Sequence, residues 1–167
     1  MQTPLNKISD EQILALLQGG GSMERGFRLL MEKYQERLYW HIRRLVLEHE
    51  DANDVIQNCF IKVFRSIHNF EGKSKLYTWL YRIATNEAIT FLNKKNRKAT
   101  ASIDDEENQG VVHHLKADEF FDGDEAQYKL QQALARLPEK QRVVFNLRYY
   151  EEMSYKEMAD VLETSVG

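Results

Sequence analysis

Apolar residues recur at three- and four-residue steps through most of the chain, which is the spacing of one face of an α-helix. The clearest series predicts one long helix and runs through Met23, Phe27, Leu30, Tyr34, Leu38, Ile42 and Leu45. Before it, Ser9 and Gln12 mark the ends of a capping box, and three glycines from Gly19 onward provide a stop, so a short helix is expected between them. The alternation of polar and apolar residues that is typical of strands is nearly absent. The pattern therefore predicts an all-α fold.

Two more helices are predicted before residue 97. One begins near Asp51 or Asn53 and carries the apolar residues Val55, Ile56, Cys59, Phe60, Val63 and Ile67. A turn over residues 70–74 separates it from the other helix, which we expect over residues 76–96. Together these helices predict a four-helix domain over residues 1–96.

The helical spacing is lost after this domain. Residues 97–123 are rich in Asp, Glu, Asn, Gly and Ser, and we expect them to form a flexible acidic linker. The spacing resumes at Asp124, and Pro138 is expected to open a helix at its first position. Ser154 and Glu157 form a second capping box ahead of a further short helix. We therefore predict a smaller second helical domain over residues 124–167.

Charge is distributed unevenly, although the formal net charge is only −3. Residues 73–98 hold seven basic residues and one acid, a balance of 7 − 1 = +6. Residues 104–125 hold nine acids and one base, a balance of 1 − 9 = −8. A basic block beside an acidic one suggests a surface that binds a polyanion, followed by a segment that avoids it.

Several classes of chemistry have little support in the sequence. The glycines at 19–21 lack the Lys-Ser/Thr of a phosphate-binding loop. A single cysteine, Cys59, excludes an intrachain disulfide and a cysteine-rich zinc site, and the adjacent pair His113-His114 lacks metal-ligand spacing. We expect no catalytic site, no cofactor and no metal. The polar start and the lack of a long apolar run indicate a cytoplasmic protein.

The predicted helix over residues 76–96 has the composition of a nucleic-acid surface. Its polar side is expected to hold Lys75, Thr78, Arg82, Asn86, Asn93 and Arg97. Tyr77, Trp79, Tyr81 and Phe91 are interleaved with this side, although these aromatic residues can instead belong to the core, as we favour for Phe91. Cations and amides beside aromatic faces are what single-stranded nucleic acid requires.

Three stretches together resemble bacterial RNA polymerase sigma factors of the small, extracytoplasmic-function (ECF) type. They read DANDVIQNCFIKVF at 51–64, FEGKSKLYTWLYRIATN at 70–86, and LPEKQRVVFNLRYY at 137–150, which continues through SYKEMA at 154–159. The resemblance spans nearly the whole chain. It implies two small helical domains that give the polymerase its promoter specificity.

The resemblance also implies roles for particular residues. The side chains expected to contact the clamp helices of the polymerase beta-prime subunit are Asp51, Asp54, Gln57, Asn58 and Lys62, although relatives often carry Glu in place of Asn58. Those expected to hold and melt minus-ten promoter DNA are Lys73, Lys75, Tyr77, Trp79, Arg82, Asn86, Lys94, Lys95 and Arg97. The linker would occupy the RNA exit path. The second domain would bind the beta flap, and an anti-sigma factor is a further expected partner.

The sequence departs from the family pattern at its end. In the family, the turn at residues 163–167 is followed by a basic recognition helix for the minus-thirty-five element, which this sequence does not include. Either this is a shortened form, or its second domain does not read DNA as it stands. Glu163 also lies where many relatives have a turn glycine. A free-standing helix-turn-helix regulator and a helical adaptor without a DNA role are the alternatives.

Overall fold

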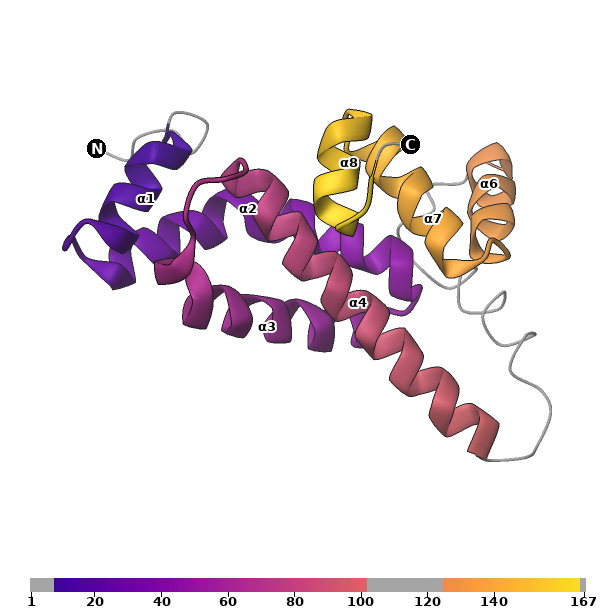
Figure 1. The fold of residues 1–167 in the computed structure, drawn as a ribbon. Coiled ribbons are helices and arrows are strands. Elements are labelled where there is room, and N and C mark those ends of the chain that lie inside the picture. Colours follow the sequence, from indigo (N-terminus) through magenta and orange to yellow (C-terminus); the bar gives the residue numbers. More distant parts are fainter. Residues whose placement is uncertain (1–7, 102–124, 166–167) are drawn as a thin grey trace.

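The computed structural model describes residues 8–101 and 125–165, and within these ranges the chain forms helices and turns without a strand (Figure 1). The first range holds α1 (Asp10–Gln18), α2 (Met23–Val46), α3 (His49–Ser66), a 3-10 turn (Ile67–Asn69) and α4 (Leu76–Ala101). The second holds α6 (Glu125–Ala135), α7 (Glu139–Phe145), a π-helical turn (Asn146–Tyr150) and α8 (Tyr155–Leu162). The expected all-α fold is confirmed.

Local hydrogen bonds begin the helices where the capping motifs predict. The Ser9 hydroxyl accepts from the Gln12 amide, and the Gln12 side chain accepts in return from the Ser9 amide. The same reciprocal pair joins Ser154 and Glu157 at the start of α8. Each box satisfies two backbone donors that a helix start would otherwise leave without partners.

Three helix boundaries differ from the predictions. Helix α3 begins at His49, two residues before Asp51, because Leu47 already ends α2 in the left-handed conformation. Helix α4 continues to Ala101, so the expected end at residue 96 is wrong. Four of the five added residues, Arg97, Lys98, Ala99 and Ala101, are good helix formers, and the two basic side chains suit a helix C-terminus. Pro138 precedes α7 as its N-cap and is not its first residue. The rest of the predicted linker, including His113 and His114, lies outside the described residues.

Helices α2, α3 and α4 enclose a core of apolar side chains. Those with no exposed surface include Leu38, Ile42, Cys59, Val63, Leu80 and Ala84. Burying each larger aliphatic side chain contributes about 1.5–3 kcal/mol to the free energy of folding. His41 is also fully buried here, and its Nε2 lies 2.9 Å from the Thr85 hydroxyl oxygen.

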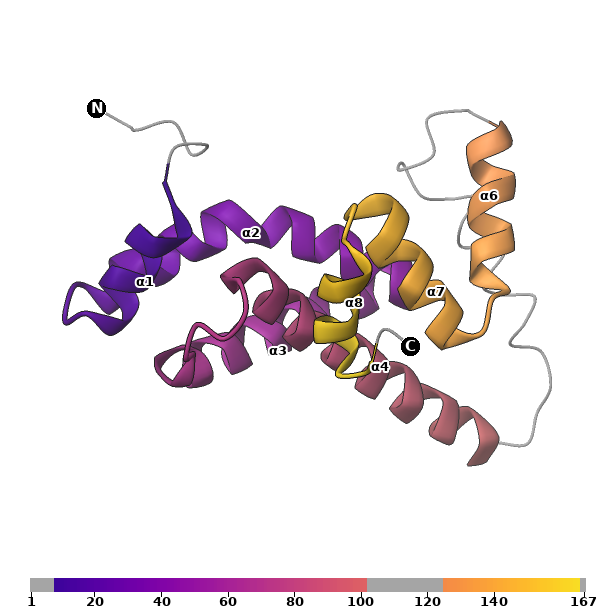
Figure 2. The ribbon, with the colours of Figure 1, turned by 45° about the horizontal axis from the view of Figure 1, so that its top comes forward.

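The second range packs directly against the first. Helix α8 packs against α4, which it crosses at an angle, and α7 approaches α2, in both views of the ribbon (Figures 1 and 2). The buried side chains Val143, Leu147, Met153, Met158 and Val161 belong to the same apolar cluster as the core of the first range. We call residues 8–101 the first unit and residues 125–165 the second unit. The two units therefore share one continuous core.

Candidate nucleic-acid interface

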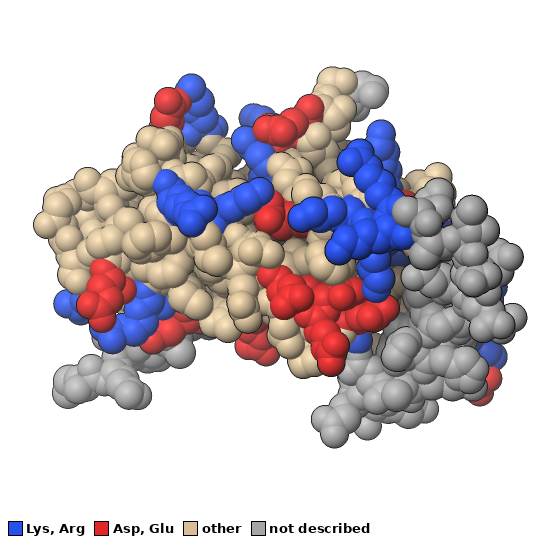
Figure 3. All heavy atoms as spheres, turned by 90° about the horizontal axis from the view of Figure 1, so that it is seen from below, with Lys and Arg blue, Asp and Glu red and all other residues tan. Residues whose placement is uncertain are grey.

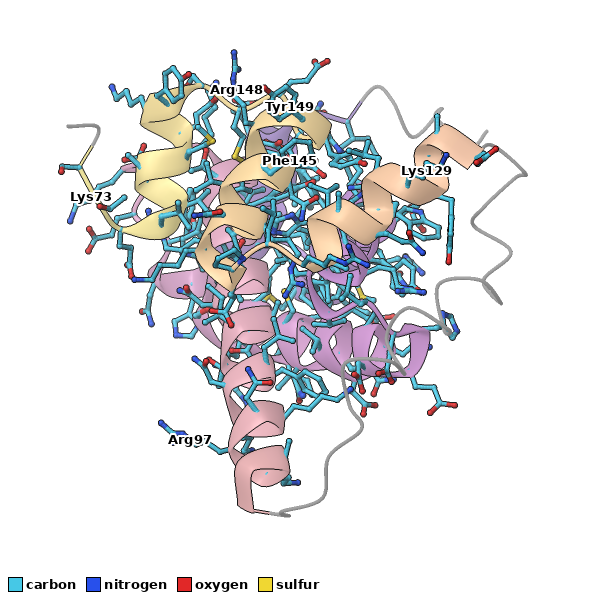
Figure 4. All side chains as sticks on the ribbon, turned by 90° about the vertical axis from the view of Figure 1, so that its right-hand side faces the viewer. Lys73, Arg97, Lys129, Phe145, Arg148 and Tyr149 are labelled. Carbon is cyan, nitrogen blue, oxygen red and sulfur yellow. The ribbon has the colours of Figure 1, made fainter. Side chains whose placement is uncertain are left out.

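Helix α4 does not present the predicted nucleic-acid residues on a single open face. Lys73, Lys75, Asn86, Lys94 and Arg97 are exposed, whereas Tyr77, Trp79, Arg82 and Lys95 are partly buried. Figure 4 shows Lys73 and Arg97 at opposite ends of this region. The helical part alone, from Leu76 to Arg97, rises roughly 32 Å at 1.5 Å per residue. The predicted residues therefore extend along the whole length of α4.

Thr78 was expected on the polar side of α4, and this expectation is wrong because only 1% of its surface is exposed. Helix α4 packs against α2 and α3 on one side and against α8 on another. More of its circumference is therefore buried than in a helix with a single apolar stripe.

The aromatic residues of α4 mostly belong to the core. Tyr81 is fully buried, with its ring centroid 5.0 Å from that of His41 and 4.6 Å from that of Tyr77. Burial, with the nearby Glu151 carboxylate, raises the pKa of Tyr81 well above its usual range. Phe91 packs against the core, as favoured from the sequence. Tyr81 therefore offers no free ring to a base in this arrangement.

A polar cavity of about 330 Å³ lies between the loop before α4 and the first turns of that helix. Its lining consists of Asn69, Phe70, Glu71, Lys73, Ser74, Trp79, Arg82 and Asp160. The Trp79 and Phe70 rings, 5.3 Å apart, give it an aromatic wall. Gly72 has φ +70°, which a glycine adopts without strain, so the loop can turn back over the helix. The volume is at the small end of the range of about 300–1,000 Å³ for ligand pockets.

Most cations expected to meet DNA already have carboxylate partners. Lys95 Nζ lies 2.9 Å from a carboxylate oxygen of Glu48 and 2.9 Å from one of Asp51. Lys73 pairs with Glu71 in the loop before α4. Figure 3 accordingly shows groups of basic and acidic side chains next to each other on this face, with no continuous basic surface.

Two of these cations pair with the second unit. Lys75 Nζ lies 3.0 Å from Glu157 Oε1. Arg82 donates through Nε to the Asp160 carbonyl at 2.9 Å, and its Nη1 lies 3.8 Å from Glu163 Oε1. The backbone cap at Ser154 and the Lys75 ammonium hold the pKa of Glu157 below its usual range, so this partner stays ionised.

The predicted polymerase-contacting residues lie on α3, and they differ in whether they already have a partner within the protein. Asp54, Gln57 and Asn58 are exposed. Lys62 pairs with Glu87 of α4, and Asp51 is occupied by Lys95. Three of the five residues therefore form an open polar surface.

An apolar groove beside that surface was missed from the sequence. It has a volume of about 610 Å³ and is lined by Phe27, Met31, Gln35, Ile56, Gln57, Phe60, Ile61, Phe64 and Arg65. Ile61 and Phe64 are 47% and 48% exposed. Both fall outside the stripe of Val55, Cys59 and Val63, and this apolar excess on α3 was the available signal.

Sequence reasoning also missed Glu151, whose side chain is only 5% exposed. Its carboxylate oxygens lie 3.6 Å from Arg37 Nη2 and 3.4 Å from Arg44 Nη1. Tyr81 donates a hydrogen bond to the same carboxylate. Residues 151 and 152 are both Glu, so the sequence gives no sign that Glu151 is buried while Glu152 is exposed.

The described residues give no sign of other site chemistry. Across residues 8–101 and 125–165, no group of His, Cys, Asp and Glu is arranged to hold a metal ion. Cys59 is buried, and burial raises the pKa of its thiol to about 12, so it is a poor nucleophile. None of the described helices is both long and apolar enough to cross a membrane.

Comparisons with known proteins agree with the segments that first suggested a family. The family model described as Sigma-70 region 2 matches residues 30–98, and the one described as Sigma-70, region 4 matches residues 127–167. The chain is 36% identical to the RNA polymerase sigma-H factor of Pseudomonas aeruginosa, over 98% of this chain and 87% of that protein. It is 32% identical to the ECF RNA polymerase sigma-E factor of Haemophilus influenzae, over 96% and 87%.

A solved structure shows the same fold. The sigma factor RpoE of Bartonella quintana, in complex with the anti-sigma factor NepR, superposes with a TM-score of 0.66 over 86% of each chain, at 21% identity. The predicted family is therefore confirmed by sequence, and the fold agrees with it. The chain belongs to the ECF group of RNA polymerase sigma factors, which direct the polymerase to promoters and thereby start transcription.

Proposed function

We propose that this sigma factor binds core polymerase through the exposed face of α3 and opens minus-ten DNA with α4 and the loop before it. The observation that carries the proposal is the cavity between that loop and α4. Trp79 and Phe70 supply an apolar wall, and Lys73 and Arg82 supply positive charge at its edge. A base turned out of the duplex needs both of these features.

The free energy of binding one flipped base is comparable to the cost of opening the DNA at that base, so the protein needs no external source of energy. Unstacking and unpairing one base costs a few kcal/mol. Stacking that base on an aromatic surface returns about 1–3 kcal/mol. Arg82 would hold the phosphate backbone beside the cavity, while exposed Asn86 would read a base edge through its amide. Lys94 and Arg97, exposed farther along α4, would hold more of the strand.

Polymerase docking would use both polar and apolar side chains of α3. Asp54, Gln57 and Asn58 would contact the beta-prime clamp helices. Ile61 and Phe64, each about half exposed, lie close to this polar surface and would add apolar area. Apolar centres with polar rims are the usual anatomy of protein interfaces. The second unit would contact the beta flap.

Three further properties follow from family membership. The Bartonella relative was solved with an anti-sigma factor, and we infer that a protein of that kind also inhibits this chain. The chain would act in the cytoplasm, where the polymerase is found. It would act by binding alone, without a catalytic step of its own.

The base-reading assignment can be tested by transcription from a promoter library with a randomised minus-ten element, using core polymerase and the full chain. Asn86→Ala should relax the preference at one position, at a cost of about 1–3 kcal/mol on the preferred base. The matched control Gln141→Ala removes an exposed amide from α7 and should keep the parent's preferences. Unaltered preferences in Asn86→Ala would show that this residue reads no base.

A further inference from the structure

Gln18, the last residue of α1, donates hydrogen bonds to two backbone carbonyls that precede α4. Its Nε2 atom lies 2.8 Å from the Ile67 oxygen and 2.8 Å from the Phe70 oxygen, and both bonds are partly buried. Ile67 begins the 3-10 turn, and Phe70 directly follows that turn. An amide nitrogen carries two N–H donors, and Gln18 uses both of them here. The side chain therefore joins α1 to both ends of the turn that leads into the loop before α4.

Packing against α2 fixes the position of α1. Ile13 and Leu17 are buried in the core, with 0% and 7% of their surfaces exposed. Gly26 of α2 lies so close to α1 that a β-carbon there would stand 2.9 Å from Leu17 Cγ. Figure 1 shows α1 beside the turn at Ile67–Asn69. Such close packing leaves α1 little freedom to move, so Gln18 holds the turn from a fixed place.

Phe70 connects this hydrogen bond to the cavity proposed for the flipped base. Its residue is only 9% exposed, so its carbonyl needs a partner within the protein. Its ring lies 5.3 Å from that of Trp79, and both rings line the cavity. The bond from Gln18 therefore fixes the backbone that carries one half of the aromatic wall.

The loop that follows Phe70 has little to hold its shape by itself. Lys73 pairs with Glu71 inside the same loop, and their side chains are 85% and 65% exposed. An exposed pair of this kind contributes little to stability, and it does not join the loop to the rest of the protein. Gly72 adds backbone freedom. The shape of this side of the cavity therefore depends on how Phe70 is held.

We propose that Gln18 is a positioning residue for base selection, which holds the aromatic wall of the cavity in place without itself contacting the base. This inference rests on the proposed function of the cavity. A wall that is free to shift fits several bases about equally, so selectivity should fall at the minus-ten position whose base enters the cavity. Binding to core polymerase should not change, because the proposed docking residues Asp54, Gln57 and Asn58 lie on α3.

The test uses Gln18→Glu in the full chain, which keeps the shape of the side chain but replaces its donor nitrogen by an oxygen. Transcription with core polymerase from a promoter library with a randomised minus-ten element gives the ratio of preferred to other bases at each position. Gln18→Glu should lower this ratio about fivefold at one position, the factor that one ordinary hydrogen bond contributes. A merely structural role would weaken all promoters alike and leave every ratio unchanged, which would overturn the proposal.

Two further variants show whether the donated hydrogen bonds are responsible. Ala15→Glu adds the same charge to an exposed position of α1 and removes no donor, so it should keep the parent's ratios. Gln18→Lys supplies new N–H donors and should keep most of the selectivity. Its positive charge strengthens binding to all sequences alike, and this effect cancels in a ratio between bases. Equal loss of selectivity in Gln18→Lys and Gln18→Glu would also overturn the proposal.

Arg82→Ala separates this inference from the proposed function, because Arg82 lines the same cavity and is proposed to hold phosphate. If Arg82→Ala transcribes all promoters as well as the parent does, the cavity is not the DNA site and the proposed function fails. If Arg82→Ala weakens transcription while Gln18→Glu matches Ala15→Glu, the cavity stands and only the role of Gln18 is wrong.

Circular dichroism and pull-down with core polymerase check that each variant folds and still binds the polymerase. If Gln18→Glu fails either check, Gln18→Met takes its place, because methionine has a similar length but neither a donor nor a charge, and Ala15→Met becomes its control. Unchanged base ratios in a folded Gln18→Met variant would overturn the proposal in the same way.

Discussion

Lys95 and Asp51 form an ion pair of 2.9 Å, which joins a residue predicted to hold DNA to a residue predicted to face the polymerase. Burial lowers the pKa of Lys95, but hydrogen bonds to Asp51 and Glu48 outweigh this effect and raise it. Its ammonium uses two of its three N–H donors on these carboxylates, so a phosphate must compete with both negative charges for Lys95. The proposed polymerase and DNA surfaces thus meet at this side chain.

Replacing Lys95 with Ala should weaken DNA binding for all sequences alike, because the side chain contacts phosphate and not bases. The salt dependence should decrease by less than it does in Arg97→Ala, whose exposed side chain has no comparable pair of carboxylates to leave. For one full phosphate contact on a single strand, the slope of log affinity against log salt changes by about 0.7. Titrations of each full-length variant with a short single-stranded DNA at several salt concentrations measure both slopes. A loss confined to particular sequences would contradict a phosphate role.

Reversing Asp54 to Lys should weaken binding to core polymerase, because a carboxylate facing a basic partner becomes a repulsion. Folding should change little, since Asp54 is exposed. Glu50→Lys is the matched control, as it reverses another exposed acid on the same helix. Pull-down with core polymerase measures the effect. Equal retention of the two variants would remove Asp54 from the docking surface.

Replacing Glu152 with Gly should stabilise the protein. Glu152 has φ +53°, a left-handed conformation that strains residues with a β-carbon but not glycine. The gain is about 1 kcal/mol or less, because glycine also adds entropy to the unfolded chain. Thermal unfolding should shift upward by about 2–4 °C. Glu36→Gly, at an exposed position inside α2, should instead lose about 1 kcal/mol. A lower melting temperature for Glu152→Gly would show that no strain is relieved there.

Stability should fall as the pH drops below about 6.5, through His41. Burial, together with the charge of Arg44, lowers the pKa of His41 from 6.5 to about 3. Below the unfolded value the unfolded chain takes up a proton that the folded chain does not, so acid favours unfolding. The slope approaches about 1.4 kcal/mol per pH unit for one such group.

Denaturant unfolding between pH 7 and pH 4 measures this slope. His41→Gln should be less stable at neutral pH, because a buried hydrogen bond to Thr85 changes. It should also show a flatter dependence on pH. An equally steep dependence in that variant would assign the acid sensitivity to other groups.

Local signals in the sequence predicted the features that depend on neighbouring residues. The caps at Ser9 and Ser154 bond to amides three residues away, so their motifs fix the helix starts. The stripe through Leu30, Leu38 and Ile42 is buried as expected, because one face of α2 covers the core. The family assignment followed from motifs of the same local kind.

Features that depend on contacts between residues far apart in the chain could not be predicted from the sequence. The close surroundings of α4 include α8, whose Glu157 lies 82 residues from its partner Lys75. No periodicity within α4 could therefore show that Thr78 is buried or that Arg82 is occupied. The burial of Glu151 likewise depends on Arg37 and Arg44, more than 100 residues earlier in the chain. The helical continuation to Ala101 depends on the helix propensity of Arg97, Lys98, Ala99 and Ala101, and the loss of the apolar spacing after residue 96 gives no sign of it.

The buried thiol of Cys59 makes it possible to measure how often the core of the first unit opens. Cys59 has no exposed surface, and its thiol ionises only far above neutral pH. A thiol reagent can react with it only after the core between α2, α3 and α4 has opened. The rate of labelling therefore counts opening events in the first unit without any added probe. Because Cys59 is the single cysteine of the chain, this signal comes from one known place.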